Sequence, residues 1–320
     1  MKWYRTMYLH QHKNFKDLIL AESEERAIDA ILIEKDYWIM HCLYGLQILG
    51  FQFELKGGTS LSKAYKIIDR FSEDIDIHIH PDPALGINEN PKNTNPKNVA
   101  KRLAFYDNLT NEIKIDGIIA VERDTVFDDT HYYRSGGIRL IYNSFFNELP
   151  GLKQGILLEI GFDNVTPNSP MDISSWAFEK AVQASIDLID NRALQVPCYD
   201  MRYTFVEKLQ TIATKFRNMQ SSGDRQVNFM RQYYDIFQLL HQKQVIDFIG
   251  NSEYLAHKER RFPTLDFEIP IAQNQAFLLE DSKVKKRLNE LYIKSSALYY
   301  NGQVDLQTIL DLLKLHLEKL

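Results

Sequence analysis

The sequence predicts an α+β lobe over residues 1–197 and a helical lobe over residues 198–320. Five short segments before residue 165 have the composition of strands, and helical patterns lie between them. From about residue 173 onward, apolar residues recur mostly at helical spacing. With 320 residues, 44% of them hydrophobic, the chain is long enough for two lobes with cores of their own.

The expected N-terminal lobe mixes helices and strands. Residues 15–50 predict one helix, because apolar side chains recur at roughly helical spacing until Gly50. A second helix is expected over 59–69, with Thr59 or Ser60 as its N-cap. The other expected elements are an extended segment at 51–55, strands at 72–80, 117–126, 131–142 and 154–163, a helix near 99–115, and loops or turns at 81–98 and 167–170.

The expected C-terminal lobe is helical, and the whole composition excludes several classes of protein. Helices are expected over 203–218, 225–243, 244–256, 271–280, 282–299 and 303–318.

The net charge of −5 excludes a generally basic nucleic-acid coat, but not a local basic cleft. Two cysteines without a CxxC pattern argue against a disulfide framework or a structural zinc site, and favour the cytoplasm. No apolar run predicts a signal peptide or a membrane span.

The stretch KGGTSLSKAYKIIDRFSEDIDIHIH (56–80) carries the clearest chemistry. In a strand alternate side chains share a face, so Asp74 and Asp76 point the same way while the isoleucines between them point into the core. Two adjacent carboxylates repel each other, and a bound Mg²⁺ or Mn²⁺ relieves that repulsion. The Gly-Gly-Thr-Ser turn before them offers backbone N–H groups at a helix start, which suits phosphate. This pairing is what phosphoryl or nucleotidyl transfer requires.

Each of these motifs also has an ordinary structural interpretation. An Asp-Ile-Asp alone is typical of a solvated strand face, and a Gly-Gly-Thr-Ser alone of a turn and cap. His78 and His80 share the aspartate face, so a mixed Asp/His metal site is an alternative. At about 3.3 Å per residue, His80 lies roughly 20 Å from Asp74, too far to share an ion. We therefore expect both histidines to be ordinary strand residues.

The same string resembles the first motif of the AbiEii/AbiGii-type nucleotidyltransferase toxins, a family of the DNA polymerase β-like superfamily. EKDYW (34–38) is similar to a segment of the larger members. ILLEIGF, VEKLQTIATKFRN and RQYYDIFQLL are similar to the second, third and fourth motifs, in order and spacing. The resemblance covers about residues 30–240, and residues 245–320 match no segment of the family. It implies a polymerase β-like nucleotidyltransferase lobe with a mixed sheet flanked by helices.

The resemblance also implies a set of site residues. Gly57, Gly58, Thr59 and Ser60 would hold a triphosphate, with Lys208 and Arg231 on its phosphates. Asp74 and Asp76 would bind the metal, with Glu159 as the third acidic residue. Asp235 would orient or deprotonate the acceptor. By their residue types alone, Arg231 and Asp235 are equally a helix-surface ion pair at i, i+4.

The expected function is a metal-dependent nucleotidyltransferase of the EC 2.7.7 type. An NTP would be the substrate, Mg²⁺ or Mn²⁺ the cofactor, and tRNA the expected class of acceptor. The resemblance implies the toxin of a toxin–antitoxin or abortive-infection system, with an antitoxin partner. Two alternatives stay open: a DxD glycosyltransferase that uses a nucleotide-sugar, and a catalytically inactive nucleotide-binding module.

Several charged and aromatic residues have a supporting role in this interpretation. Glu34, Lys35 and Asp36 predict a polar helix stripe, with a buried charge network as the second choice. Arg70 precedes the acidic strand and is expected to balance its charge. A cleft for an RNA acceptor would need a set of basic residues to converge, namely Lys101, Arg102, Arg123, Arg134, Arg139, Lys208, Arg217 and Arg225.

Overall fold

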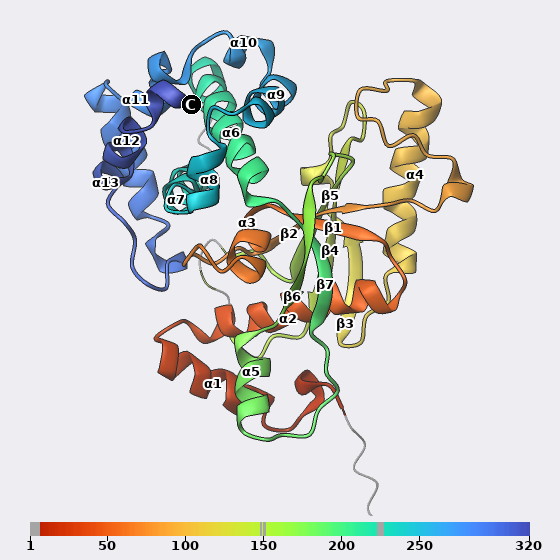
Figure 1. Cartoon of the computed structure of the whole chain (residues 1–320). Helices are drawn as coiled ribbons and strands as arrows, with labels where there is room; N and C mark the ends of the chain where they lie inside the picture. The colour runs from red at the N-terminus through yellow and green to blue at the C-terminus, as the bar shows by residue number, and fades with distance from the viewer. Residues whose placement is uncertain (1–6, 148, 150–151, 223–226) are drawn as a thin grey trace, which may run out of the picture. The chain divides into compact units, whose positions relative to one another are not determined.

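The structure, a computed structural model, describes residues 7–147, 149, 152–222 and 227–320. The chain forms two units (Figure 1). Unit 1 contains the residues up to Ala64 together with Ser72–Tyr199, and unit 2 contains Tyr65–Phe71 together with Asp200–Leu320. The chain therefore leaves unit 1 for seven residues directly before the acidic strand and then returns to it.

A mixed seven-stranded sheet is the centre of unit 1. Its strand order is β3-β4-β5-β2-β1-β7-β6. The pairs β2–β5 and β1–β7 are parallel, and the other neighbours are antiparallel. The strands are β1 (Phe53–Lys56), β2 (Asp74–Ile79), β3 (Ile118–Arg123), β4 (Ser135–Tyr142), β5 (Ile156–Gly161), β6 (Asn168–Ile173) and β7 (Ala193–Tyr199). The α+β character of the expected N-terminal lobe is thus confirmed.

Two of the helices expected in unit 1, over 15–50 and 59–69, differ from the structure. They are α1 (Phe15–Arg26), α2 (Ala30–Ile48), α3 (Gly57–Thr59), which a π-helical turn (Ser60–Ala64) continues, α4 (Pro96–Glu112) and α5 (Trp176–Gln183), with 3-10 turns at Leu9–Gln11, Pro83–Leu85 and Thr125–Phe127. The single helix expected over 15–50 is wrong. Ala27 adopts a left-handed conformation with φ 55°, and Asp29 caps a new helix by accepting from the Ile31 N–H.

The two faces of the sheet differ in character. Tyr142 of β4 stacks on Trp38 of α2, and a Cβ on Gly136 of β4 would come within 2.8 Å of the Tyr106 ring of α4. Because alternate residues of a strand share a face, α2 and α4 cover the same face of the sheet. Gly137 lies on the other face, beside Glu159 of β5. That second face carries the polar side chains.

Three expectations about local structure are wrong. The turn expected at 167–170 is the start of the edge strand β6, which pairs with β7, a strand that the sequence pattern did not predict. The helix expected over 59–69 begins at Gly57 instead, and regular helical structure ends at Ala64. Thr59 and Ser60 therefore lie inside the first turn and do not cap it.

Unit 2 is helical, as the sequence predicts. Its helices are α6 (Met201–Ser222), α7 (Arg231–Leu239), α8 (Lys243–Phe248), α9 (Ser252–Arg261), α10 (Thr264–Phe267), α11 (Gln275–Leu278), α12 (Ser282–Ile293) and α13 (Leu306–Lys314), with 3-10 turns at Val227–Met230, Ile271–Gln273, Ser296–Leu298 and Leu317–Lys319. The first two residues of the helix expected over 225–243 lie outside the described residues. Among the helices that the structure describes, none combines the length and apolarity needed to cross a bilayer.

Candidate active site

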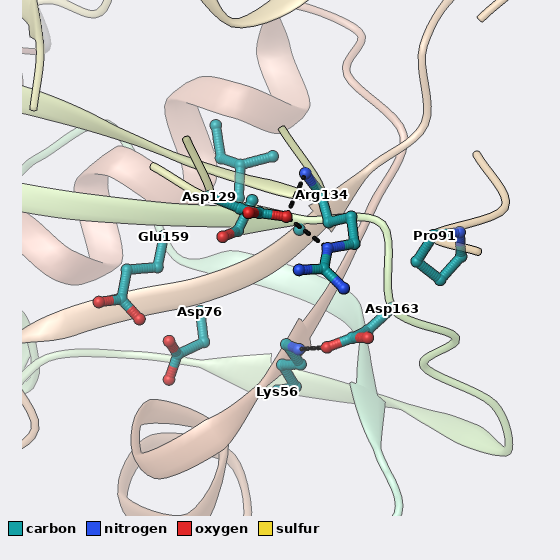
Figure 2. A pocket seen from close by; sticks show the side chains of 10 residues that line it. Lys56, Asp76, Pro91, Asp129, Arg134, Glu159 and Asp163 are labelled. Carbon is teal, nitrogen blue, oxygen red and sulfur yellow. Dashed lines mark hydrogen bonds and ion pairs between the residues drawn. The ribbon is translucent and has the colours of Figure 1, made fainter. Parts of the chain in front are cut away.

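Three carboxylates meet on the polar face of the sheet in unit 1. The isoleucines of β2 are fully buried, whereas Asp74 and Asp76 are half-buried, so the expected alternation is confirmed. Strand β5 lies parallel to β2 and places Glu159 in register with Asp76. Residues in register on neighbouring strands project from the same face. Figure 2 shows the carboxylates of Asp76 and Glu159 beside each other.

Mutual repulsion and burial make this group of acids electrostatically unfavourable. Burial raises the pKa of Glu159 to about 9, with further contributions from the charge of Asp76, a hydrogen bond to it, and the charge of Asp74. Burial also raises the pKa of Asp74, and the nearby Glu73 and Asp76 act in the same direction against Lys153. Lys153 Nζ lies 3.4 Å from Asp74 Oδ2. Lys153 and Lys35 both lower the pKa of Asp74, but they do not offset its burial and the neighbouring acids.

Features of the backbone and of hydrogen bonding suit this group to a cation. Gly57 has a φ of +73°, and a Cβ there would lie 1.9 Å from Asp76 Oδ2. A larger residue would therefore displace the carboxylate. Asp74 Oδ1 is buried and has no hydrogen-bond partner among the described residues. Carboxylate oxygens alone are the donor set that Mg²⁺ and Mn²⁺ prefer.

The Gly-Gly-Thr-Ser turn is held directly to the acidic strand. Gly58, Thr59 and Ser60 are all buried. The Thr59 hydroxyl donates to the main-chain carbonyl of Asp74 at 2.5 Å, and the Ser60 hydroxyl donates to the Gly57 carbonyl at 2.9 Å. The Ser60 hydroxyl thus stabilises the turn, and the Thr59 hydroxyl holds the turn against the strand. This use of both side chains was not visible in the sequence.

The EKDYW segment supports the site from behind. Glu34, Lys35 and Asp36 are all buried, so the polar helix stripe is wrong and the buried charge network is confirmed. Asp36 lies 2.5 Å from the ammonium of Lys63, in the turn that follows Ser60, and accepts from the Trp176 N–H.

Lys35 of the same segment supports the acids through the residues next to them. Its ammonium donates to the main-chain carbonyl of Lys153 and lies 3.9 Å from Glu73. The Lys153 N–H in turn donates to Glu73. Burial lowers the pKa of Lys35 to about 8, although the charges of Glu73 and Asp74 oppose that shift. Lys35 thus fixes the backbone beside the lysine that faces Asp74.

A pocket of about 340 Å³ opens beside the acids (Figure 2). Asp76 and Glu159 line it together with residues of two ion pairs. Lys56 Nζ lies 2.8 Å from Asp163, and Arg134 pairs with Asp129. The pocket thus has both charges on its wall, which suits an anion that arrives with a cation.

In unit 2, two of the expected site residues form one buried ion cluster. Asp235 is fully buried and accepts bidentately from the Arg70 guanidinium at 2.6 Å and 2.6 Å. The Lys208 ammonium lies 2.8 Å from the same carboxylate. Arg70 therefore pairs with Asp235 and does not balance the acidic strand, so that expectation is wrong. Arg231 is buried at the start of the same helix, α7.

Burial and charge oppose each other at Asp235. Burial alone raises the pKa of its carboxyl, but the charges of Arg70 and Lys208 and their hydrogen bonds lower it below its usual value. Sequence reasoning assigned Arg70 to the wrong acids because its partner Asp235 lies 165 residues later. The neighbours Tyr233 and Tyr234 are both buried in the core.

Most of the basic residues expected to line an RNA cleft are held by partners in their own unit. Arg102 donates to main-chain carbonyls, including that of Asn88, and Lys101 donates to those of Leu85 and Gly86. The ion pairs are Arg123 with Asp107 and Asp128, Arg134 with Asp129, Arg139 with Asp124, Lys208 with Asp235, and Arg217 with Asp266. Arg225 lies outside the described residues.

Comparison with known proteins identifies the family. A search of the curated proteins finds no match. The family model described as "Nucleotidyl transferase AbiEii toxin, Type IV TA system" matches residues 41–298. This match extends beyond residue 240, so the C-terminal limit of the resemblance given by the motifs alone is corrected, while EKDYW lies before the matched residues. The chain therefore belongs to the AbiEii family of nucleotidyl transferase toxins of type IV toxin–antitoxin systems.

Proposed function

We propose that this chain is a metal-dependent nucleotidyltransferase that moves a nucleotide from an NTP to an acceptor hydroxyl, with tRNA as the first acceptor to test. Membership of the family supports a nucleotidyl transferase activity and a role as a toxin, and it implies a cognate antitoxin. One observation supports the metal above all: Asp74, Asp76 and Glu159 meet on one face, and the pKa values of Asp74 and Glu159 are raised despite the lysines nearby. This is the charge balance that a divalent cation corrects.

In this proposal unit 1 would bind the ion and the triphosphate. Asp74, Asp76 and Glu159 would hold Mg²⁺ or Mn²⁺ by carboxylate oxygens. The ion would neutralise the phosphates and stabilise the charge that develops on pyrophosphate as it leaves. The backbone from Gly57 to Ser60 would contact the phosphates, since the glycines allow a close approach. We also propose that unit 1 has a polymerase β-like nucleotidyltransferase fold.

The chemistry is a substitution at the α-phosphorus. The oxygen of the acceptor hydroxyl forms a bond to that phosphorus and loses its proton to water, and the bond to the oxygen bridging to the β-phosphate breaks, so that pyrophosphate leaves. Lys208 and Arg231 would contact phosphates. Asp235 already accepts from Arg70 and Lys208 with both oxygens, which supports a positioning role for it.

A transfer assay tests this function. Purified protein is mixed with Mg²⁺, each α-labelled NTP in turn, and either total RNA or a protein extract. Asp74→Asn is the test variant, and Asp311→Asn, an exposed acid in unit 2, is the matched control. We expect label on a tRNA-sized band with the wild type and the control, and none with Asp74→Asn.

Other outcomes of this assay discriminate among the alternatives. Label on a protein band would retain the transferase and replace the acceptor. Hydrolysis of a nucleotide-sugar without incorporation of any NTP would favour the glycosyltransferase. Tight nucleotide binding with no product from any NTP would overturn the proposal in favour of a binding module.

A further inference from the structure

A second group of metal-ligating side chains lies farther along the acidic strand. Glu54 of β1 and His78 of β2 are partners across the antiparallel pair, and His80 follows two residues later. Glu89 joins them from the segment after β2. His78 is two residues beyond Asp76, about 7 Å along the strand, so this group is separate from the carboxylates of the proposed transferase site.

The two imidazoles lie side by side between the two glutamates. Their ring centroids are 4.3 Å apart. A single oxygen of Glu89, Oε2, lies 2.8 Å from His78 Nε2 and 3.1 Å from His80 Nδ1. On the opposite side, Glu54 Oε1 lies 2.8 Å from His80 Nε2, and Glu54 Oε2 lies 3.6 Å from His78 Nδ1.

When both imidazoles are neutral, the side of the rings that faces Glu54 lacks hydrogen atoms. A neutral imidazole has one N–H, so a ring that donates to Glu89 presents a lone pair from its other nitrogen. Both rings can donate to Glu89, and their lone pairs then face the carboxylate of Glu54. Glu54 Oε2 is buried and has no hydrogen-bond partner among the described residues. Acceptors that converge on one another without donors are the mark of a cation site.

We propose that Glu54, His78 and His80 bind a divalent transition-metal ion, with Zn²⁺ as the favoured ion, and that Glu89 orients both imidazoles. One donor atom from each of the three residues lies within 4.8 Å of the others. Ligands about 2.1 Å from a tetrahedral zinc are about 3.4 Å apart, close to the 2.8 Å and 3.6 Å observed around Glu54. Two imidazoles and one carboxylate leave the fourth position open.

Glu89 has the position that supporting carboxylates occupy around histidine ligands. It accepts from the ring nitrogen that would not contact the metal, which fixes the tautomer and strengthens the ligand. The two nitrogen donors also make this site different from the all-carboxylate group at Asp74. Imidazole favours zinc and its neighbours over Mg²⁺, whereas carboxylates alone favour Mg²⁺. The chain would therefore hold two kinds of cation at neighbouring positions of one strand.

Metal binding here would also stabilise a wall of the pocket. Arg102 is fully buried and donates to the carbonyls of Asn88, Asn90 and Asn93, so it holds the segment around Glu89 from one side. Pro91, in the same segment, lines the pocket beside Asp76 (Figure 2). Ion-bound histidines that keep Glu89 in place would hold this segment from its other side. A bound ion would thus hold this segment of the pocket wall in place.

Calorimetric titration with ZnCl₂ tests the site, in excess Mg²⁺ so that the carboxylates of the other site are occupied. His80→Gln is the first variant, because His80 is 41% exposed and the change leaves the fold intact. His131→Gln, an exposed histidine elsewhere in unit 1, is the matched control. We expect one zinc per chain with wild type and control, and at least a tenfold weaker affinity with His80→Gln and with His78→Gln. Glu89→Gln should weaken zinc about 10–100-fold while keeping the stoichiometry.

A spectroscopic arm identifies the ligands independently of activity. Co²⁺ in a four-coordinate nitrogen and oxygen site absorbs visible light strongly, and in a six-coordinate carboxylate site weakly. We expect the strong spectrum with the wild type and with Asp74→Asn, and its loss with His80→Gln. Zinc binding that is lost with Asp74→Asn but kept with His80→Gln would assign the ion to the carboxylates and overturn the proposal. Absence of zinc binding at micromolar concentrations would do the same, leaving a hydrogen-bonded cluster only.

Discussion

The two units each contain a buried acidic centre, and the two centres are neutralised in opposite ways. In unit 1, Asp74, Asp76 and Glu159 face one another, and Lys153 forms an ion pair with Asp74 at 3.4 Å. In unit 2, Asp235 faces two cations, Arg70 and Lys208. Burial is common to both centres. The pKa of Glu159 is raised and the pKa of Asp235 is lowered, so the difference comes from the neighbouring charges.

This difference separates a site that needs a ligand from a cluster that is complete. The acids of unit 1 destabilise the fold without a cation, which is the cost that many binding sites carry. In the cluster of unit 2 the buried carboxylate already has two cationic partners. Mutations should therefore change stability in opposite directions in the two places, and that contrast can be tested.

The largest effect is expected from Asp235→Asn. Removing this charge leaves Arg70 and Lys208 buried without their counter-ion, which should lower the free energy of unfolding by about 3–5 kcal/mol. Urea unfolding followed by circular dichroism measures it. Asp247→Asn, which removes an exposed i, i+4 partner of Lys243, is the control and should cost less than about 1 kcal/mol. Equal losses of unfolding free energy for the two variants would show that the buried cluster stabilises the fold no more than an exposed ion pair does.

Asp76→Asn should act in the opposite direction on stability. Removing one of the repelling carboxylates should raise the metal-free unfolding free energy by on the order of 1–3 kcal/mol. Nucleotide transfer should fall by at least about 100-fold, since the ion loses a ligand. Unfolding curves with and without Mg²⁺ check this, because Mg²⁺ should stabilise the wild type and not the variant. A variant less stable than the wild type in metal-free buffer would contradict our account of the acids.

The pH dependence of stability should reveal Glu159. Its folded pKa of about 9 lies above the ordinary value of 4.5, so the folded state holds a proton that the unfolded state has lost between these values. The stability it contributes is therefore complete below about pH 4.5 and is lost as the pH rises toward 9. In Glu159→Gln this fall in stability should disappear, because the amide does not titrate. Melting temperatures at a series of pH values in a chelating buffer measure it, and parallel curves for the two proteins would refute the assignment.

The smallest effect is expected from Lys153→Met. The ion pair with Asp74 is long, at 3.4 Å, and partly exposed, so its loss should change the unfolding free energy by less than about 1 kcal/mol. The same change removes a cation that competes with a bound metal, so Mg²⁺ should bind more tightly. A Mg²⁺ titration of the melting temperature shows this. Weaker Mg²⁺ binding would instead give Lys153 a supporting role in the metal site.

The sequence predicted those features that depend on neighbouring residues. The alternation of DIDI placed both aspartates on one face, and that is what the structure has. The pairing of Asp76 with Glu159 depends on the register of β2 and β5, which join residues 83 positions apart in no local pattern. Glu159 could therefore enter only through the family resemblance. Its charge repulsion with Asp76 follows from the fold alone.

Other features contradict the ordinary preferences of their residues. Strand β6 contains Pro170, which argued for a turn, but an edge strand tolerates a proline because one side has no neighbour. Three consecutive charged residues, Glu34 to Asp36, predicted an exposed stripe. All three are buried, because residues far away in the sequence supply their hydrogen bonds and ion pairs. The sequence predicted that His78 and His80 are ordinary strand residues, because their partners Glu54 and Glu89 belong to other segments of the chain.

The excursion of Tyr65–Phe71 into unit 2 has a consequence for how the protein is made. Arg70 leaves the ribosome 165 residues before its partner Asp235. At about 5–20 residues per second, that interval is roughly 8–33 s. During this time the flanking segments can fold into unit 1 while these seven residues wait for a partner not yet synthesised. Translation therefore cannot complete one unit and then begin the other, and a ribosome that stalls before residue 235 leaves Arg70 without its counter-ion.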